Sequence, residues 1–422
     1  MNTIFDIISM KAEGLELDNN NLNKFLKSIS KQSISDTQIA SMLMAIFING
    51  MTKKETMEYT KALINSGEQL KHDCNGFIID KHSTGGVGDK VSFIVGPILA
   101  ALGYFVPMIA GRSLGFTGGT IDKLESIPGY NVNLPIGKFK SIVKRVGISI
   151  IAQTDSICPL DKKIYSIRDI TATIASNPLI AGSIMSKKIA EGINGLIIDM
   201  KIGEGTFIKN KSDGIKLLRL MKSIAYEHNV KFNYIMSSMN NPLGKTSGLR
   251  TEIDESIDAL KGNGEKNLME VVYSIALKAQ NLAGDKKSVK KIDETISSGT
   301  AYEIFEKQIY LHGGKLTENS FKPTSELIIK AKESGFIEKI NARNIGIANT
   351  MIGCGRINHK SKLDYSAGIE IIIGDGRKVK KGEPVLRAFC SNHKKIKSIT
   401  DILEQSISIG HSKKNNSLLI IE

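Results

Sequence analysis

The stretch Lys81-His-Ser-Thr-Gly-Gly-Val-Gly-Asp-Lys90 decides the fold, because it joins an apolar run to a helix through a glycine-rich turn. The apolar run is Phe77-Ile-Ile79, and the residues from Val91 to Leu102 predict a helix. A strand, a glycine-rich turn and a helix in this order present backbone N–H groups to an anion, and the helix dipole assists. The stretch therefore predicts an α/β layer with an anion-binding turn.

A second glycine-rich stretch, Gly111 to Thr120, follows another apolar run, Val106 to Ala110. Two such turns close in sequence can converge on one phosphate. The first stretch does not have the pattern of a known nucleotide-binding loop. Gly88 is followed by Asp89 where a P-loop needs Lys, and a Gly-x-Gly-x-x-Gly run is missing. The two turns therefore favour a phosphate site without identifying its ligand.

The composition favours a cytoplasmic protein of two or three domains. The chain has 422 residues, 41% of them hydrophobic, and no apolar run long enough for a membrane span. The N-terminal residues do not resemble a signal peptide. The four cysteines are scattered without a C-x-x-C pair, which favours reduced thiols over a disulfide or a zinc site: Cys74, Cys158, Cys354 and Cys390.

The net charge of +14 raises the question of nucleic-acid binding. The lysines are spread along the chain and interleaved with acidic residues, and they are not clustered with aromatic residues. We therefore expect a solvated basic surface and no nucleic-acid partner.

The order of the patterns predicts a fold that is α/β with three parts. Helical patterns at 1–66 and 160–192 predict a small, discontinuous α-helical domain, and strands alternate with helices over 75–154 and 193–330. The latter predict a larger α/β domain with a mixed, mostly parallel sheet. Short apolar runs broken by glycine predict a β-rich region at 331–422, after a linker at 313–333.

Several polar residues are candidates for chemistry, each with a structural alternative. Lys81, Ser83, Ser92 and Thr120 lie in or beside the glycine-rich stretches and suit phosphate. His82 is either a catalyst or a structural histidine. Ser183 and Lys187 stand four residues apart, so they share one helix face, which is functional or merely solvated.

The motifs together resemble the thymidine and pyrimidine-nucleoside phosphorylase family, and most closely its bacterial pyrimidine-nucleoside members. The resemblance covers nearly the whole chain in order. It rests on the first stretch and on Gly111-Arg-x-Leu-Gly-x-Thr-Gly-Gly-Thr-Ile-Asp-Lys-Leu-Glu125, Asp161-Lys-Lys-x-Tyr165, Arg168-Asp-Ile-Thr-Ala-Thr173, Ser183-Ile-Met-Ser-Lys-Lys188, Asp199-x-Lys-x-Gly203, Asn241-Pro-Leu-Gly244 and Lys380-Lys-Gly-Glu-Pro384.

This resemblance implies a homodimer with its dimer contact in the helical domain and its active site in a cleft. It implies reversible phosphorolysis of uridine, thymidine or deoxyuridine in nucleoside salvage, with inorganic phosphate as co-substrate and no organic cofactor. By match, Lys81, Ser83, Ser92 and Thr120 would hold phosphate, and His82, Arg168 and Lys187 would be catalytic. The base would meet Arg168, Ser183, Lys187, Tyr165, Leu114 and Phe207.

The sequence departs from the family pattern at several of these places. Ala110 replaces a frequent serine, Phe116 a histidine, Ser113 a glycine and Leu249 an asparagine. The resemblance also implies a monovalent-cation site for K+, in which Lys90 and Thr246 differ from the usual residues. That site would comprise Gly88, Lys90, Leu243, Thr246 and Glu255.

Two alternatives stay open beside a broad pyrimidine-nucleoside phosphorylase. One is a thymidine-specific phosphorylase. The other, motivated by Ala110 and Phe116, is a nucleoside- or phosphate-binding homologue with impaired catalysis. The sequence leaves open the preferred sugar and base, and whether His82 transfers a proton or only donates a hydrogen bond.

Overall fold

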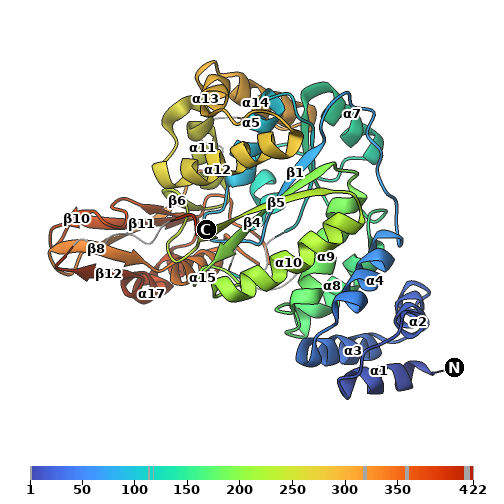
Figure 1. Cartoon of the computed structure of the whole chain (residues 1–422). Helices are drawn as coiled ribbons and strands as arrows, with labels where there is room; N and C mark the ends of the chain where they lie inside the picture. Colours follow the sequence, from blue (N-terminus) through green and yellow to red (C-terminus); the bar gives the residue numbers. More distant parts are fainter. Residues whose placement is uncertain are drawn as a thin grey trace. The chain divides into compact units, whose positions relative to one another are not determined.

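The computed structural model describes residues 2–112, 115–116, 118–316, 321–356, 361–412 and 419–421. The chain forms two compact units (Figure 1). The helical unit comprises Met1–Asp73, Gln153–Leu196 and Ser212–Phe232. The α/β unit comprises Cys74–Ala152, Ile197–Lys211 and Asn233–Glu422.

The helical unit is built from three separate chain segments. Its N-terminal helices begin at polar caps, and Ser35 with Gln38 and Thr52 with Glu55 form complete capping boxes. Its helices are α1 (Ile4–Ala12), α2 (Asn19–Ser30), α3 (Asp36–Asn49), α4 (Lys53–Ile64), α8 (Pro159–Ile170), α9 (Asn177–Ala190) and α10 (Lys211–Glu227). The apolar faces of α1–α4, α8 and α9 share one core, which includes Leu22, Phe25, Ile39, Met42, Leu63, Ile164 and Leu179.

The central strands form a three-stranded sheet of order β1-β4-β5 and a two-stranded sheet of order β2-β3. The strands are β1 (Ile79–Ser83), β2 (Val106–Ala110), β3 (Ile148–Ala152), β4 (Gly195–Ile202) and β5 (Lys231–Ser238). β2 and β3 pair in parallel, and a parallel bridge from Ile78 to Phe105 joins β1 to β2. Every residue of β4 is buried, as expected for a strand covered on both faces.

Helices from distant parts of the chain pack together in this unit (Figure 1). α12 and α14 both contact α5, whose eight buried residues include Pro97. The helices are α5 (Val91–Ala101), α6 (Thr120–Leu124), α7 (Ile136–Val146), α11 (Arg250–Asp258), the short π-helix η1 (Ala259–Asn263), α12 (Lys266–Ala283), α13 (Val289–Ser297) and α14 (Thr300–Leu311).

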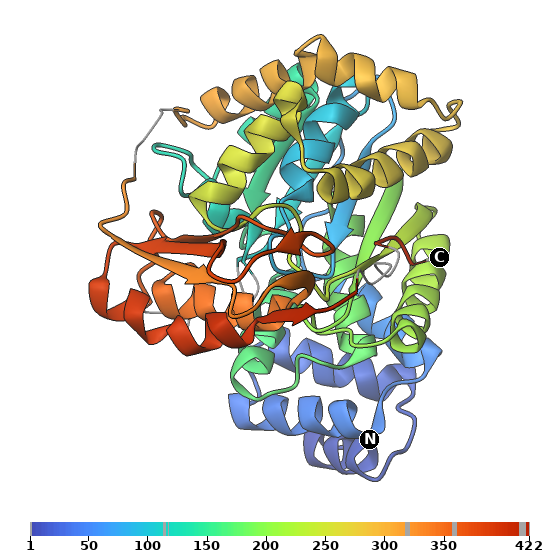
Figure 2. The same cartoon turned by 90° about the vertical axis from the view of Figure 1, so that its left-hand side faces the viewer.

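The C-terminal residues form most of two antiparallel sheets with short helices, drawn in orange and red in Figure 2, and the short strand β6 from earlier in the chain joins one of the sheets. One sheet has the order β6-β9-β11-β7 and the other β10-β8-β12. The strands are β6 (Thr246–Gly248), β7 (Ser325–Lys330), β8 (Gly335–Ile340), β9 (Gly368–Ile371), β10 (Lys378–Val379), β11 (Pro384–Cys390) and β12 (Ile407–Gly410). The helices are α15 (Ala342–Ile352), α16 (His393–Ser398) and α17 (Thr400–Gln405).

The predicted fold class is confirmed, with a helical part, an α/β part with parallel strands and a β-containing C-terminal part. The prediction of a linker at 313–333 is wrong in its second half, because β7 pairs there with β11. The apolar residues of β7 form only a short run, Leu327 to Ile329, which did not distinguish this strand from a loop. The predicted domain bounds stay a prediction, and the contacts group 212–232 with the helices. Within the described ranges, no helix has the length and apolar character needed to cross a membrane.

Candidate active site

Three elements of the α/β unit meet at the Lys81 side chain. Lys81 lies on β1, Ser92 in the first turn of α5, and Asp199 on β4. The Lys81 Nζ atom donates to Ser92 Oγ at 3.4 Å and lies 3.7 Å from Asp199 Oδ2. It is also 3.8 Å from Asp89 Oδ1, at the end of the first glycine-rich stretch. The structure therefore brings together two of the predicted phosphate residues, Lys81 and Ser92.

Two further buried lysines stand in the same region but are paired more closely. Lys201 Nζ is 2.8 Å from Asp199 Oδ2, and Lys123 Nζ is 2.5 Å from Glu252 Oε2. Lys123 also donates to the Asp89 carbonyl oxygen at 2.8 Å. Of the three lysines, Lys81 has the longest distances to its carboxylates. Its ammonium group is therefore the one best able to attract a further anion.

Ser83 and Asp89 close the first glycine-rich turn. The Ser83 hydroxyl donates to Asp89 Oδ2, and the Gly85 backbone N–H donates to Ser83 Oγ at 3.1 Å. Burial disfavours the charged carboxylate, but Lys81, Lys201, the Ser83 hydrogen bond and Lys123 together hold the pKa of Asp89 well below its usual range. Asp89 is thus a carboxylate that fixes the position of Ser83.

His82 occupies the next position along β1, where it is half-buried. Successive side chains of a strand point to opposite faces. His82 therefore points away from the face that carries Lys81, and the catalytic role expected for it stays a prediction.

The second glycine-rich stretch is described only in part. Thr120 is the first residue of α6 and is half-buried, and Ala110 ends β2. Leu114 and Ser113, predicted to line or alter the site, lie outside the described residues. The ring of Phe116 lies 5.9 Å from that of Phe207, and the Arg343 guanidinium lies 5.8 Å from its centroid.

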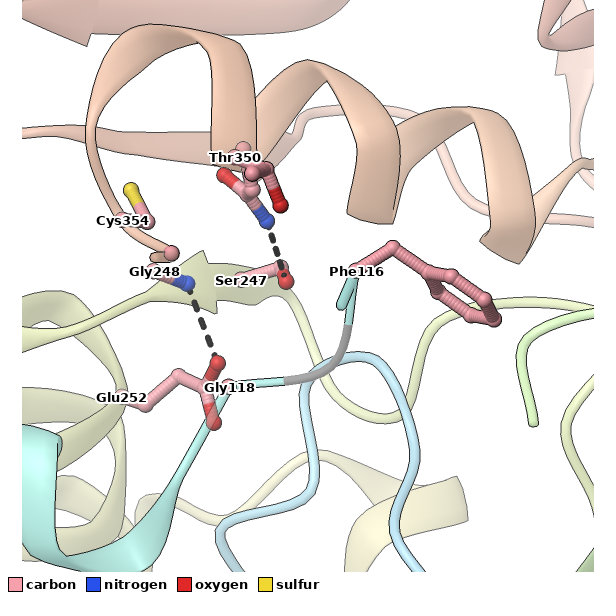
Figure 3. A pocket seen from close by; sticks show the side chains of 9 residues that line it. Phe116, Gly118, Ser247, Gly248, Glu252, Thr350 and Cys354 are labelled. Carbon is pink, nitrogen blue, oxygen red and sulfur yellow. Dashed lines mark hydrogen bonds between the residues drawn. The ribbon is translucent and has the colours of Figure 1, made fainter. Parts of the chain in front are cut away.

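A small pocket lies under this second stretch (Figure 3). Its volume is about 10 Å³, enough for about one water and too small for a nucleoside. Glu252 accepts the Gly248 N–H at 3.0 Å on one side, and Asn349 donates to Ser247 Oγ at 2.7 Å on another (Figure 3). The pocket is therefore too small to hold a nucleoside in this structure.

A second polar cluster belongs to the helical unit and is formed by α8 and α9. Lys187 Nζ donates to Ser183 Oγ at 2.9 Å and forms an ion pair with the buried Asp161. The predicted shared face of Ser183 and Lys187 is thereby confirmed. Asp161 stood in the motif that carried the family resemblance, yet it received no role from the sequence.

Arg168 is buried beside this pair. Its guanidinium donates to the carbonyl oxygens of Ile174 at 2.8 Å, Leu179 at 3.1 Å and Thr173 at 3.4 Å. A guanidinium has five N–H groups, so these bonds leave two for another planar acceptor. The bonds also hold the turn between α8 and α9, where Ala172 has a left-handed backbone with φ +57°.

The Tyr165 ring lies close to both cations of this cluster. Its centroid is 5.7 Å from the Arg168 Cζ atom and 6.0 Å from the Lys187 Nζ atom. Burial raises the pKa of Tyr165 to about 12, although Arg168 opposes the rise, so the phenol is neutral near pH 7. The cluster offers an aromatic face and two cations with N–H donors, which suits a planar heterocycle that carries carbonyl groups.

The structure thus gathers the predicted site residues into two sets. Lys81, Ser83 and Ser92 lie together in the α/β unit, and Tyr165, Arg168, Ser183 and Lys187 lie together in the helical unit. Phe207 lies in the α/β unit against Phe116. The sequence patterns did not identify the charged partners of these residues. Asp199 and Asp161 are distant in sequence from Lys81 and Lys187, whereas Asp89 lies inside the first glycine-rich stretch and carried no signal for its pairing. Lys123, Lys201 and Glu252 were missed as well.

Comparisons with known proteins match this arrangement. The α/β domain of the glycosyl transferase family matches residues 75–302, its helical bundle domain 5–67, and the pyrimidine nucleoside phosphorylase C-terminal domain 336–410. A thymidine phosphorylase of Colwellia psychrerythraea is 41% identical over 394 residues, 90% of each chain. A pyrimidine-nucleoside phosphorylase of Staphylococcus aureus is 37% identical over 417 residues, 96% of each chain.

A solved structure extends the comparison to the fold alone. Anthranilate phosphoribosyltransferase from Thermus thermophilus superposes with a TM-score of 0.58 at 14% identity, over 73% of this chain and 99% of the other. The family models and the curated relatives cover most of the sequence, including both polar clusters. The chain therefore belongs to the thymidine and pyrimidine-nucleoside phosphorylase family.

Proposed function

We propose that this chain is a pentosyltransferase that catalyses the reversible phosphorolysis of pyrimidine nucleosides. An oxygen of inorganic phosphate attacks C1′ of the sugar, and the bond from C1′ to the base nitrogen breaks with its electron pair going to the base. The products are a pentose 1-phosphate and the free base after protonation. Family membership and the loosely paired Lys81 ammonium support this proposal most directly.

Each polar cluster suits one partner of this reaction. Lys81 and the Ser92 and Ser83 hydroxyls, with Thr120, would bind and orient phosphate, a weak nucleophile whose alignment contributes much of the rate. Arg168 and Lys187 would stabilise the negative charge that develops on the departing base. His82 would donate a proton or a hydrogen bond to a base carbonyl, and Tyr165, Leu114 and Phe207 would line the base.

A nucleoside panel tests the proposal. The protein is incubated with uridine, thymidine and deoxyuridine, each with and without phosphate, and the free base is separated by chromatography. We expect phosphate-dependent release of base from at least one of the three. Release from none would contradict the proposal, whereas release from thymidine alone would establish the narrower thymidine-specific activity.

The catalytically impaired alternative makes a different prediction in the same samples. Ala110, at the end of β2, supplies no hydroxyl to phosphate, and Phe116 supplies no imidazole. An impaired homologue would be stabilised against heat by phosphate or nucleoside but would release no base. We propose further that the chain acts as a homodimer, which sedimentation analysis of the intact protein would test.

A further inference from the structure

The Lys90 side chain is enclosed by oxygen atoms in the α/β unit. Lys90 stands directly before α5, and its side chain is fully buried. Its Nζ atom donates to the Thr246 carbonyl oxygen at 2.7 Å, to the Leu243 carbonyl oxygen at 2.9 Å and to Glu255 Oε2 at 2.7 Å. An ammonium group has three N–H donors, so these three acceptors satisfy it completely.

The Glu255 carboxylate is equally well satisfied. It accepts the backbone N–H groups of Lys245 at 2.7 Å and Thr246 at 2.8 Å, and the Thr246 hydroxyl at 2.6 Å. Burial disfavours its charge, but Lys90 and these donors keep the pKa of Glu255 below its usual value. The carboxylate and the two carbonyl groups thus form a preorganised cage around one positive charge.

The cage leaves little space around its occupant. A Cβ atom at Gly244 would lie 2.4 Å from Glu255 Oε1 and 2.8 Å from Lys90 Nζ. A Cβ atom at Gly88 would lie 2.5 Å from the Leu243 carbonyl oxygen. The five residues that the family resemblance implied for a K+ site are therefore together, and the ammonium group stands among the very oxygens that would bind the ion.

These residues do not fit a free monovalent cation. Carbonyl and carboxylate oxygens are suitable ligands for K+. However, a cation at these oxygens would lie beside the positively charged Lys90 ammonium group, which already donates its three N–H bonds to the same oxygens. We propose that Lys90 is a tethered cation that takes the place of a free monovalent ion, so that the native protein needs none.

The cage connects the first glycine-rich stretch to a distant part of the chain. Besides the Lys90 bonds, the Leu243 N–H donates to the Val87 carbonyl oxygen at 3.1 Å. Asp89, which fixes Ser83, lies next to Lys90 in the sequence. Lys90 is therefore a positioning residue for the phosphate-binding turn, and any effect of Lys90 on phosphate rests on the proposed function.

The test compares Lys90→Ala, which empties the cage, with Lys90→Met, which fills it without charge. Thermal unfolding of both variants and of the native protein is measured in choline, sodium, potassium and ammonium chloride at equal ionic strength. Lys216→Ala, at an exposed lysine on α10, is the control. This stability readout does not depend on the reaction, and KM for phosphate is measured separately as the functional readout.

We expect the native Tm to be the same in all four salts. Lys90→Ala should lose about 5–10 °C in choline chloride and recover at least half of that loss in potassium or ammonium chloride, whereas Lys90→Met should not recover. A native Tm that rises specifically with potassium would overturn the proposal. So would a Lys90→Ala protein that is equally stable in all four salts. If Lys90→Ala does not fold, thermal unfolding of the native protein and of Glu255→Gln in the same four salts is the deciding experiment. Glu255→Gln should have a lower Tm than the native protein, and no cation should restore it.

Discussion

Lys81 is the first residue of the first glycine-rich stretch and Lys90 is the last. Both side chains are buried, but the hydrogen bonds and charges around them differ. Lys90 makes three hydrogen bonds of 2.7–2.9 Å that use all its donors. Lys81 makes a 3.4 Å bond to a hydroxyl and has carboxylates at 3.7 and 3.8 Å. A lysine that has satisfied every donor supports the fold, and one held loosely among opposite charges retains the capacity to bind an anion.

The largest expected effect is on catalysis, in Lys81→Met. Lys81 supplies a buried positive charge to the phosphate anion, and removing one partner of such a charge pair costs enough binding energy that kcat/KM for phosphate should fall by about 100- to 1,000-fold. The stability of Lys81→Met should fall less than that of Lys90→Met. Asp199 keeps its ion pair with Lys201, and the Lys201 charge also acts on Asp89. Steady-state kinetics with phosphate varied, alongside thermal unfolding of both variants, would measure the contrast.

Lys216 is an exposed lysine, and Lys216→Met is the matched control. It should keep the native kcat/KM for phosphate and the native Tm. If Lys81→Met lost stability as severely as Lys90→Met and kept its kcat/KM for phosphate, the two lysines would have the same structural role and the comparison would fail.

His312 is a buried side chain with a hydrogen-bond partner at each ring nitrogen. It tests whether such a group makes the free energy of unfolding depend on pH. Its Nδ1 faces the Asn131 carbonyl at 3.0 Å, so Nδ1 carries the proton, and Nε2 accepts from Ser149 Oγ at 2.8 Å. Burial lowers the pKa of His312 from 6.5 to about 4, against the opposing hydrogen bond to Asn131. The unfolded chain therefore binds a proton before the folded one as pH falls from about 6.5 to about 4.

The free energy of unfolding should fall over that interval by on the order of 3 kcal/mol through this histidine. Urea unfolding at successive pH values would show the slope, and His312→Gln should flatten it. An unchanged slope in the variant would show that other groups titrate there. His228, whose pKa burial also lowers, is one such group, and His228→Gln would measure its share of the slope.

Gly88→Ala is expected to disturb the cage around Lys90, at a cost of about 2 kcal/mol of stability. Gly88 has φ +75°, and its added Cβ would press on the Leu243 carbonyl that accepts from Lys90. Gly103→Ala is a close control, since Gly103 has φ +92° and nothing described lies within 4 Å of its Cβ position. If both variants lost equal stability, backbone strain alone would account for Gly88, and the contact with Leu243 would be irrelevant.

Local sequence patterns predicted most of the fold but not the partners of the buried charges. The strand, turn and helix around Lys81 follow from short-range signals, and so does the shared face of Ser183 and Lys187. Glu255 stands 165 residues from Lys90, and no spacing rule connects two such positions. The resemblance grouped them, but it implied a bound ion. Only the side-chain geometry shows that the lysine itself reaches the oxygens.

The smallest expected effects come from removing one hydroxyl on each side of the comparison. Ser92→Ala deletes the hydroxyl that accepts from Lys81, and Thr246→Val deletes the one that donates to Glu255 in the cage. Each loss is worth about 1 kcal/mol. For Ser92→Ala it should appear as an approximately fivefold rise in KM for phosphate with Tm nearly unchanged. For Thr246→Val it should appear as lower stability with KM unchanged. Measuring Tm and KM for phosphate in both variants therefore distinguishes the structural role of Lys90 from the phosphate-binding role of Lys81. If Thr246→Val raised KM and left Tm unchanged, the cage would take part in phosphate binding directly.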